Sequence, residues 1–278
     1  MDWKRIYRTH RILLLGVTAL AIVVFVLIGW ADRVVYVDAD GVVHTVNAET
    51  LTGGGATTLE AGTYVVCSDI TYTGTVTLTG DVTLILSDGC TMTVDVADGD
   101  GIKAFDGSWN SYSLTIYGQE EQSGMLCVHS PERGIWCGAL VVNGGVVSAT
   151  TDEWQSIAAT DSVVINRGVV MADNKGRKTS AIQGDKDVTI HGGKVTAKSG
   201  GVGISTYEGD IHLGYKDNDD YITASSFLVY FGTVRIGEGL VFSDGSKTYT
   251  SETESSTLSS LKHVTLTPAK EDSSMAVR

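Results

Sequence analysis

Basic residues are scarce in this sequence. Of its 278 residues, 20 are Lys or Arg and 33 are Asp or Glu, which gives a formal net charge of -13. An acidic surface repels the phosphate backbones of DNA and RNA, so a nucleic-acid partner is not expected. The charge by itself is weak evidence for cation binding, because many soluble proteins are acidic.

Proline is also scarce, with 2 residues, whereas glycine is abundant, with 33. Valine and threonine are frequent as well. This composition favours strands joined by turns of Gly, Asn and Asp over helices. Apolar residues make up 42% of the chain, which is enough to bury a core. We therefore expect an all-β protein.

The cysteine pattern of a metal centre is missing. The four cysteines form no CxxC pair and no Cys/His spacing typical of zinc. Four cysteines would allow two disulfides in an oxidising compartment. The repeat described below places Cys127 and Cys137 on opposite faces of the chain, which excludes that pair, and we expect free thiols.

A long charge-free run occurs only at the N-terminus. Residues 1–11 carry four basic residues, and 12–30 form an apolar run without a charge. A basic flank before an apolar run is typical of an export signal, so the chain from Asp32 onwards is expected outside the cytoplasm, in the medium or at the cell surface. Gly29 and Ala31 suit signal-peptidase cleavage, whereas the length of the run suits a retained membrane anchor. Both interpretations stay open, and only the second implies contact with a membrane.

An internal repeat is the strongest signal in the sequence. Segments 113–119, 140–150, 163–173 and 188–198 align with one another, and 211–225 keeps their pattern with a longer turn. One apolar anchor recurs at intervals of 26, 23, 25 and 23 residues: Ile116, Val142, Ile165, Ile190 and Leu213.

Each repeat contains three short β runs. Strands this short cannot each bury a face alone, but coils stacked about 4.8 Å apart would pair them in parallel sheets around one core. The repeat therefore predicts a right-handed parallel β-helix with 23–26 residues per coil. Side-chain alternation predicts inward columns in the second and third runs. These are Leu126/Val147/Val170/Val195/Ile222, Val128/Ala149/Ala172/Ala197/Ala224 and Ile102/Ile135/Ile157/Ile182/Ile204.

Four parts of the chain follow from this pattern. Residues 1–31 are a signal peptide or membrane anchor, and 32–61 are a capping hairpin, which we expect to cover the open first coil, and a lead-in. Residues 62–243 form the β-helix, and 244–278 form a C-terminal cap and tail. Asn143 and Asn166 occupy equivalent turns, where a ladder of side chains is predicted.

Several segments are distinctive beyond the plain repeat. They are YVVCSDITYTGTVTLTGDVTLILSDGCTM, LTIYGQ, IHLGYKDNDDYITASS and GTVRIGEGLVFSDG. In these segments the chain resembles secreted β-helix repeat proteins of gut Bacteroidales and related anaerobes, which are often labelled carbohydrate-binding or adhesin-like. The resemblance covers roughly residues 34–267. It implies the fold and an exported location, and says very little about a ligand.

Catalytic groups are absent from the predicted outward columns. Glycoside hydrolysis needs two carboxylates on one face, and lyases commonly need acidic calcium ligands beside a base. The three outward columns contain no acid: Thr115/Val141/Val164/Thr189/His212, Cys127/Ser148/Met171/Thr196/Thr223 and Lys103/Trp136/Ala158/Gln183/Ser205. We therefore do not expect an enzyme, and a polysaccharide lyase or hydrolase with catalytic residues in its loops is the second alternative.

One turn has the donors of a cation site. Asp217, Asp219 and Asp220 place oxygen atoms at alternating positions, which fits Ca²⁺. The rest of an EF-hand pattern is missing, and acidic turns are common without metal. A solvated turn is therefore the favoured interpretation, calcium is its alternative, and no other cofactor is expected.

Aromatic side chains are the remaining candidates for binding. Trp136 projects from the third sheet, and Trp154, Trp109 and Tyr112 lie in neighbouring loops. Together they would form a patch on which sugar rings stack, or else they would pack over the sheet and shield it. We predict a non-enzymatic exported scaffold that binds a glycan or a host surface; the alternative is a structural envelope or matrix protein without a small ligand.

Overall fold

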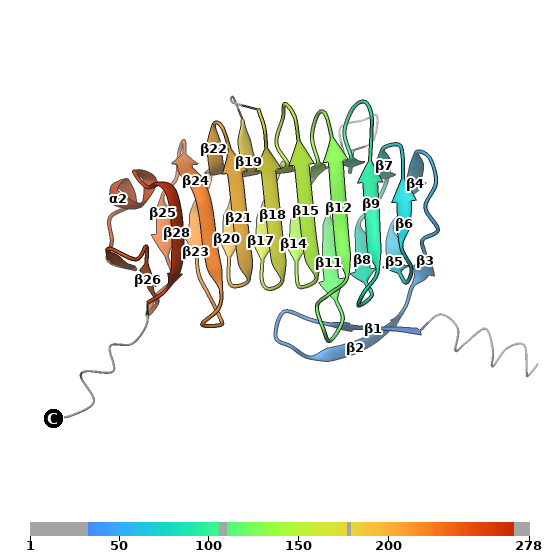
Figure 1. Ribbon diagram of the computed structural model, residues 1–278, viewed down its shortest axis with the longest axis horizontal. Coiled ribbons are helices and arrows are strands. Elements are labelled where there is room, and N and C mark those ends of the chain that lie inside the picture. The colour runs from blue at the N-terminus through green and yellow to red at the C-terminus, as the bar shows by residue number, and fades with distance from the viewer. Residues whose placement is uncertain (1–32, 106–109, 177–178, 270–278) are drawn as a thin grey trace, which may run out of the picture.

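The computed structural model describes residues 33–105, 110–176 and 179–269. The predicted signal or anchor at 1–31 lies outside these residues. The described chain is a parallel β-solenoid of about 8 turns with about 23 residues per turn (Figure 1). Among the described residues, no helix is long and apolar enough to cross a membrane.

Three parallel sheets run along the solenoid, and each coil contributes one strand to each sheet. Sheet A contains β3 (Glu49–Thr50), β5 (Gly62–Val66), β8 (Val82–Leu86), β11 (Leu114–Gly118), β14 (Leu140–Val142), β17 (Val163–Ile165), β20 (Val188–Ile190), β23 (Ile211–Leu213) and β25 (Val234–Ile236). Sheet B contains β6 (Ile70–Tyr72), β9 (Thr91–Asp95), β12 (Met125–Ser130), β15 (Val146–Thr151), β18 (Val169–Asn174), β21 (Lys194–Ser199) and the first part of β24 (Tyr221–Val229). Sheet C contains β4 (Thr57–Leu59), β7 (Val76–Leu78), β10 (Ile102–Lys103), β13 (Ile135–Cys137), β16 (Ile157–Ala159), β19 (Ser180–Gly184), β22 (Val202–Thr206) and the last part of β24.

The predicted register is confirmed. Ile116 pairs with Val142, and the sheet A column continues through Ile165 to Leu213. The two predicted columns of sheet B and the isoleucine column of sheet C are also paired residue by residue. These side chains are almost fully buried in one continuous core, because every inward position of one coil meets the same position of the next.

The turn between sheets A and B is built from a polar ladder and a glycine column. Asn166 Nδ2 donates a hydrogen bond to Asn143 Oδ1 (2.8 Å), as predicted for these two residues. Two residues after Asn166, Gly168 has φ +87°, a conformation that favours glycine. A Cβ atom there would lie 2.5 Å from the carbonyl oxygen of Gly145 in the preceding coil. Adjacent coils can therefore approach this closely only through glycine.

The N-terminal hairpin does not lie over the open end of the first coil, where we expected it. β1 (Arg33–Val37) and β2 (Val43–Asn47) pair antiparallel, and Val37 also pairs with Gly118 of sheet A. The hairpin runs along the side of the solenoid (Figure 1). The physical reason is an apolar outer surface on the early coils: Val65 and Ile85 face outward from sheet A, and the hairpin buries them.

The tip of the hairpin reaches later coils. Lys216 Nζ donates to the carbonyl oxygen of Ala39 (2.9 Å), and Arg167 donates to that of Asp38 (3.4 Å). The hairpin thus bridges residues far apart in the sequence. It links the start of the described chain to coils near its end.

The C-terminal end of the solenoid is covered. β26 (Val241–Ser243), β27 (Thr248–Thr250) and α2 (Ser255–Ser259) precede β28 (Lys262–Pro268), which pairs antiparallel with β24. The side chains of Phe242 and Leu258 are completely buried beneath these elements. This cap closes the apolar cross-section that the last coil would otherwise expose to water.

Candidate functional site

Two of the predicted aromatic residues are brought together, and an arginine joins them. Trp136 projects outward from β13, and Trp154 lies in the loop that follows β15. The guanidinium carbon of Arg133 is 4.1 Å from the ring centre of Trp136 and 5.4 Å from that of Trp154. Cation–π attraction therefore holds both indole rings against one charged plane. Trp154 keeps 44% of its surface exposed.

Neighbouring side chains hold Trp136 and Arg133 in place. The Trp136 ring centre lies 4.0 Å from that of the buried Phe105, and Lys103 Nζ lies 5.4 Å from the Trp136 ring. Asp100 is nearly buried; its Oδ1 accepts a hydrogen bond from the amide of Arg133 (3.2 Å) and lies 3.6 Å from its guanidinium. Since Asp100 of the preceding coil and Trp136 of β13 both hold Arg133, the exposed indole of Trp154 rests on a rigid base.

The other two predicted aromatics are Trp109 and Tyr112. Trp109 lies outside the described residues. Tyr112 is partly buried against the main core, and its amide donates to the carbonyl oxygen of Ala104 (2.9 Å). Among the described residues, Arg133 is the centre of the cluster that Trp136 and Trp154 form. That residue stands three positions before Trp136, so a search for cations beside the predicted outward tryptophan would have found it.

A second aromatic cluster was missed. The ring centre of Tyr207 lies 5.5 Å from that of Tyr230 and 5.4 Å from that of Phe231. These residues occupy equivalent turns between sheets C and A in the last two coils, and Phe231 is 74% exposed. Their spacing of one coil was the available signal, because residues one repeat apart stack.

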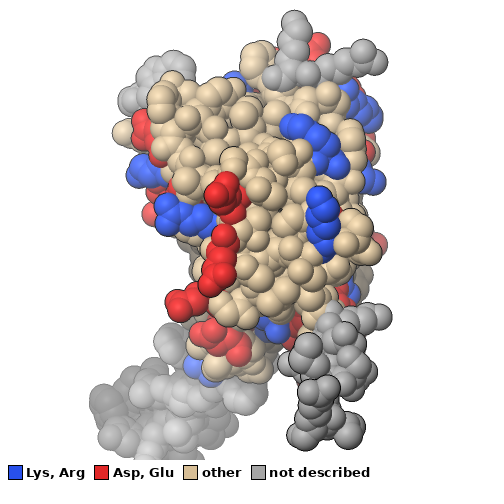
Figure 2. All heavy atoms as spheres, turned by 90° about the vertical axis from the view of Figure 1, so that its left-hand side faces the viewer, with Lys and Arg blue, Asp and Glu red and all other residues tan. Residues whose placement is uncertain are grey.

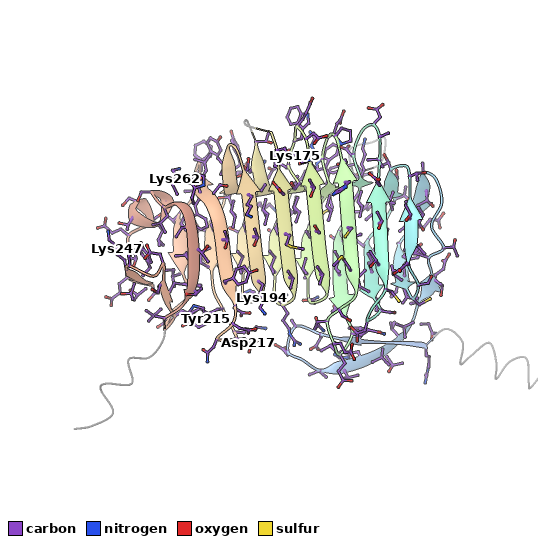
Figure 3. All side chains as sticks on the ribbon, in the orientation of Figure 1. Lys175, Lys194, Tyr215, Asp217, Lys247 and Lys262 are labelled. Atoms are coloured by element: carbon purple, nitrogen blue, oxygen red, sulfur yellow. The ribbon has the colours of Figure 1, made fainter. Side chains whose placement is uncertain are left out.

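Two carboxylates of the acidic turn between β23 and β24 are held by hydrogen bonds and an ion pair within the protein. Asp220 Oδ2 accepts hydrogen bonds from the amides of Lys216 (2.8 Å) and Asp217 (3.0 Å), and Asp219 forms an ion pair with Lys194 (2.7 Å). Figure 3 shows Lys194 and Asp217 at the lower edge of the solenoid. In the described chain, no three His, Cys, Asp or Glu side chains are grouped as a metal ion would require. These contacts favour the solvated turn over the calcium site.

An outward column containing acids was also missed. Most strands of sheet B have six residues, whereas the sequence repeat had indicated three, and the extra length adds an outward position at each end, of which the one at the C-terminal end contains the acids. The paired residues at this position are Asp95, His129, Thr150, Asp173 and Lys198. The surface of sheet B therefore carries carboxylates, whereas the predicted outward columns contained none.

The four cysteines are free thiols. Cys137 points into the core and Cys127 points outward, as the repeat predicted. Complete burial raises the pKa of the Cys137 thiol to about 12. This thiol is therefore protonated at neutral pH, and it acts as a small apolar side chain in the core.

Comparison of the chain with protein-family models, with curated proteins and with solved structures gave no match.

Proposed function

We propose that this protein is an exported, non-enzymatic scaffold that binds glycans through the surface around Trp154. We infer that the solenoid is right-handed, because connections between parallel strands have that hand in nearly all proteins. The resemblance to secreted β-helix repeat proteins supports this proposal, as does the basic and apolar N-terminal segment at 1–31.

The observation that carries the proposal is the fixed indole pair around Arg133. Sugar rings stack their C–H faces on exposed aromatic rings, and a ring that is already immobilised loses little conformational entropy on binding. Trp154 is 44% exposed while Arg133 lies over its ring, so the side chain is both accessible and held in place. An aromatic side chain that merely shielded the sheet would have no need to remain this exposed.

The positions of the outward acids support a non-catalytic role. Asp95 and Asp173 occupy one column and are separated by two intervening coils. Three rung spacings place their backbones about 14 Å apart. Glycoside hydrolysis requires carboxyl groups roughly 5 to 9.5 Å apart. This pair is therefore too widely spaced for the usual two-carboxylate chemistry.

A glycan array probed with residues 32–278, which include every described strand and both core clusters, tests the proposal. We expect selective binding that Trp154→Ala lowers about five- to thirtyfold, since stacking on one aromatic ring is worth on the order of 1 to 2 kcal/mol. Phe231→Ala is the matched control, because it removes an exposed ring from a different edge. If Phe231→Ala abolishes binding and Trp154→Ala does not, the binding surface is the second aromatic cluster.

Absence of binding to every glycan would instead favour the structural envelope or matrix alternative. The enzyme alternative predicts release of reducing or unsaturated sugars from acidic polysaccharides, with and without a chelator. Membrane fractionation of the full-length protein distinguishes a retained anchor at 12–30 from a cleaved signal.

A further inference from the structure

The edge between sheets B and C descends in steps along the solenoid. The connecting loop comprises residues 152–156 after β15 and 175–179 after β18, but only 200–201 after β21. In the last coil, β24 passes from sheet B into sheet C without a break. Because the loops shorten, this edge is lower towards the C-terminal end. Trp154 lies in one of the longer loops.

A groove lies at this edge where the connecting loops are short. It has a volume of about 430 Å³ and lies over the end of β21 and the bend of β24. Its lining includes Lys175, Lys198, Asp173, Ser225 and His263. The groove exists because β24 turns away after Ala224, so that Lys198 and Ser199 at the end of β21 pair with β18 but not with β24.

The far wall of the groove has an unusual backbone. His263 has φ +46°, in the left-handed region that is uncommon for residues other than glycine. It lies between two ladder pairs of β28, Ala224–Val264 and Ser226–Lys262, and its conformation interrupts the ladder between them. The imidazole belongs to the lining of the groove.

Lys198, which lines this groove, and Lys262, next to the lining residue His263, differ from the lysines that form ion pairs. Lys186, Lys194 and Lys216 each lie within 4.0 Å of a carboxylate. Within the described residues, Lys198 and Lys262 have no carboxylate at ion-pair distance. Lys175 pairs with Asp152 at 3.3 Å, but both side chains are more than half exposed, so this pair is weak and can be exchanged.

The charges around the groove therefore favour an anion, despite the acidic composition of the chain. Among the described residues, Asp173 is the one acid of its lining, against the cations Lys175 and Lys198. Charges more than about 8 Å away are screened at physiological ionic strength, so the net charge of -13 does not decide affinity at this point. Figure 2, which looks at the C-terminal end, shows basic side chains right of centre, on the side of sheet B, and acidic side chains mainly left of centre, beside further basic ones. Figure 3 places Lys175 and Lys262 along the same upper edge.

We propose that this groove is a subsite for the acidic group of a sugar, a carboxylate or a sulfate ester, on the glycan that stacks on Trp154. The inference rests on the proposed function, because the groove begins in the loop next to that of Trp154: the Lys175 amide donates to the carbonyl oxygen of Thr151 (2.9 Å). A glycan chain that runs parallel to the solenoid axis would cross Trp154 first and then place its next units above Lys198. An anionic membrane is a poorer fit, since the exposed acids Asp152 and Asp173 would be pressed against it.

The test measures binding of the full chain, in a polyoxyethylene detergent that carries no sugar, to paired polymers. Polygalacturonate is compared with its methyl ester, and dextran sulfate with dextran, so the two arms separate a carboxylate from a sulfate. We expect at least one acidic polymer to bind more tightly than its neutral partner. Lys198→Gln should weaken that binding about three- to tenfold, as expected for loss of one charge-assisted contact at a partly exposed site. His263→Asn, which tolerates the left-handed backbone, should also weaken it.

Lys186→Gln is the matched control, because it removes the same charge from the turn between sheets C and A. Equal binding of acidic and neutral polymers, no binding to either acidic polymer, an equal effect of Lys186→Gln, or tighter binding to phosphatidylserine vesicles would each overturn the inference. Trp154→Ala is measured in the same assay. Loss of binding with Trp154→Ala but not with Lys198→Gln would leave the glycan proposal intact and refute the acidic subsite; the reverse result would refute the role of Trp154.

Discussion

Replacement of Gly168 by alanine provides a direct test of how the coils stack. Gly168 has φ +87°, and a Cβ atom in this region costs about 1 to 2 kcal/mol in any L-residue. The new methyl group would also lie 2.5 Å from the carbonyl oxygen of Gly145. That oxygen belongs to the backbone of the preceding coil, so the two coils must separate to relieve the contact, at about 1 to 3 kcal/mol.

The matched control is Gly239→Ala. Gly239 has φ +74° and follows β25 in a turn of the same kind, but no atom lies within 4 Å of its Cβ position. This substitution carries the conformational cost of about 1 to 2 kcal/mol alone. The difference between the two variants therefore isolates the close approach of adjacent coils.

We expect Gly168→Ala to lower the free energy of unfolding by about 2 to 5 kcal/mol and Gly239→Ala by about 1 to 2 kcal/mol. Urea denaturation followed by circular dichroism gives both values, and unchanged slopes show that the transitions are comparable. Equal losses in the two variants would refute the conclusion that glycine is required here by the spacing of the coils.

Two further predictions concern titratable groups. Burial raises the pKa of the Cys137 thiol to about 12. Iodoacetamide at pH 8 should therefore alkylate the exposed Cys67 in the native protein but reach Cys137 only after unfolding. Mass spectrometry of the alkylated protein measures both reactions. Hydrogen bonds from Tyr249 and two backbone amides hold the pKa of Asp244 well below its ordinary value of 3.8. A carboxylate with a lowered pKa stabilises the folded state above its ordinary pKa, and this contribution is lost as the pH falls through the lowered one. The midpoint temperature of thermal unfolding should therefore fall less steeply below pH 4 in Asp244→Asn than in the unaltered protein. Parallel falls in the two proteins would exclude a contribution from this residue.

The core could be predicted because its signal is repeated. Ile116, Val142 and Ile165 occupy one column, and each is stabilised by the same neighbours in the coil before and the coil after. A shift of register by one residue would turn every one of these side chains outward, so the pattern admits one solution. The Asn143–Asn166 hydrogen bond follows from the same periodicity.

The features that the sequence analysis missed depend on contacts outside the repeat. The hairpin buries the outward-facing Val65 and Ile85, and its tip contacts Lys216 and Arg167, which lie 177 and 129 residues from their partners in the hairpin. A local pattern can predict that such a hairpin forms, but it cannot indicate which surface the hairpin covers. The length of the sheet B strands was underestimated for a related reason: the residues after Val128 and Ala149 alternate too weakly in polarity to mark the end of a strand.

The candidate surfaces lie where the repeat is least regular, and the physics of a solenoid explains why. Inward positions must fit the coils on both sides, so a change there costs stability in two places. Arg133, Trp154 and Lys175 lie in loops between sheets B and C and are not part of the core, so they can differ from coil to coil without disturbing it. Because the loops differ in length, the edge between sheets B and C is uneven and contains a groove. The side chains that distinguish one coil from another lie in these loops. A binding site of this protein is therefore expected along that edge, and substitutions at the inward positions of the strands should change stability far more than recognition.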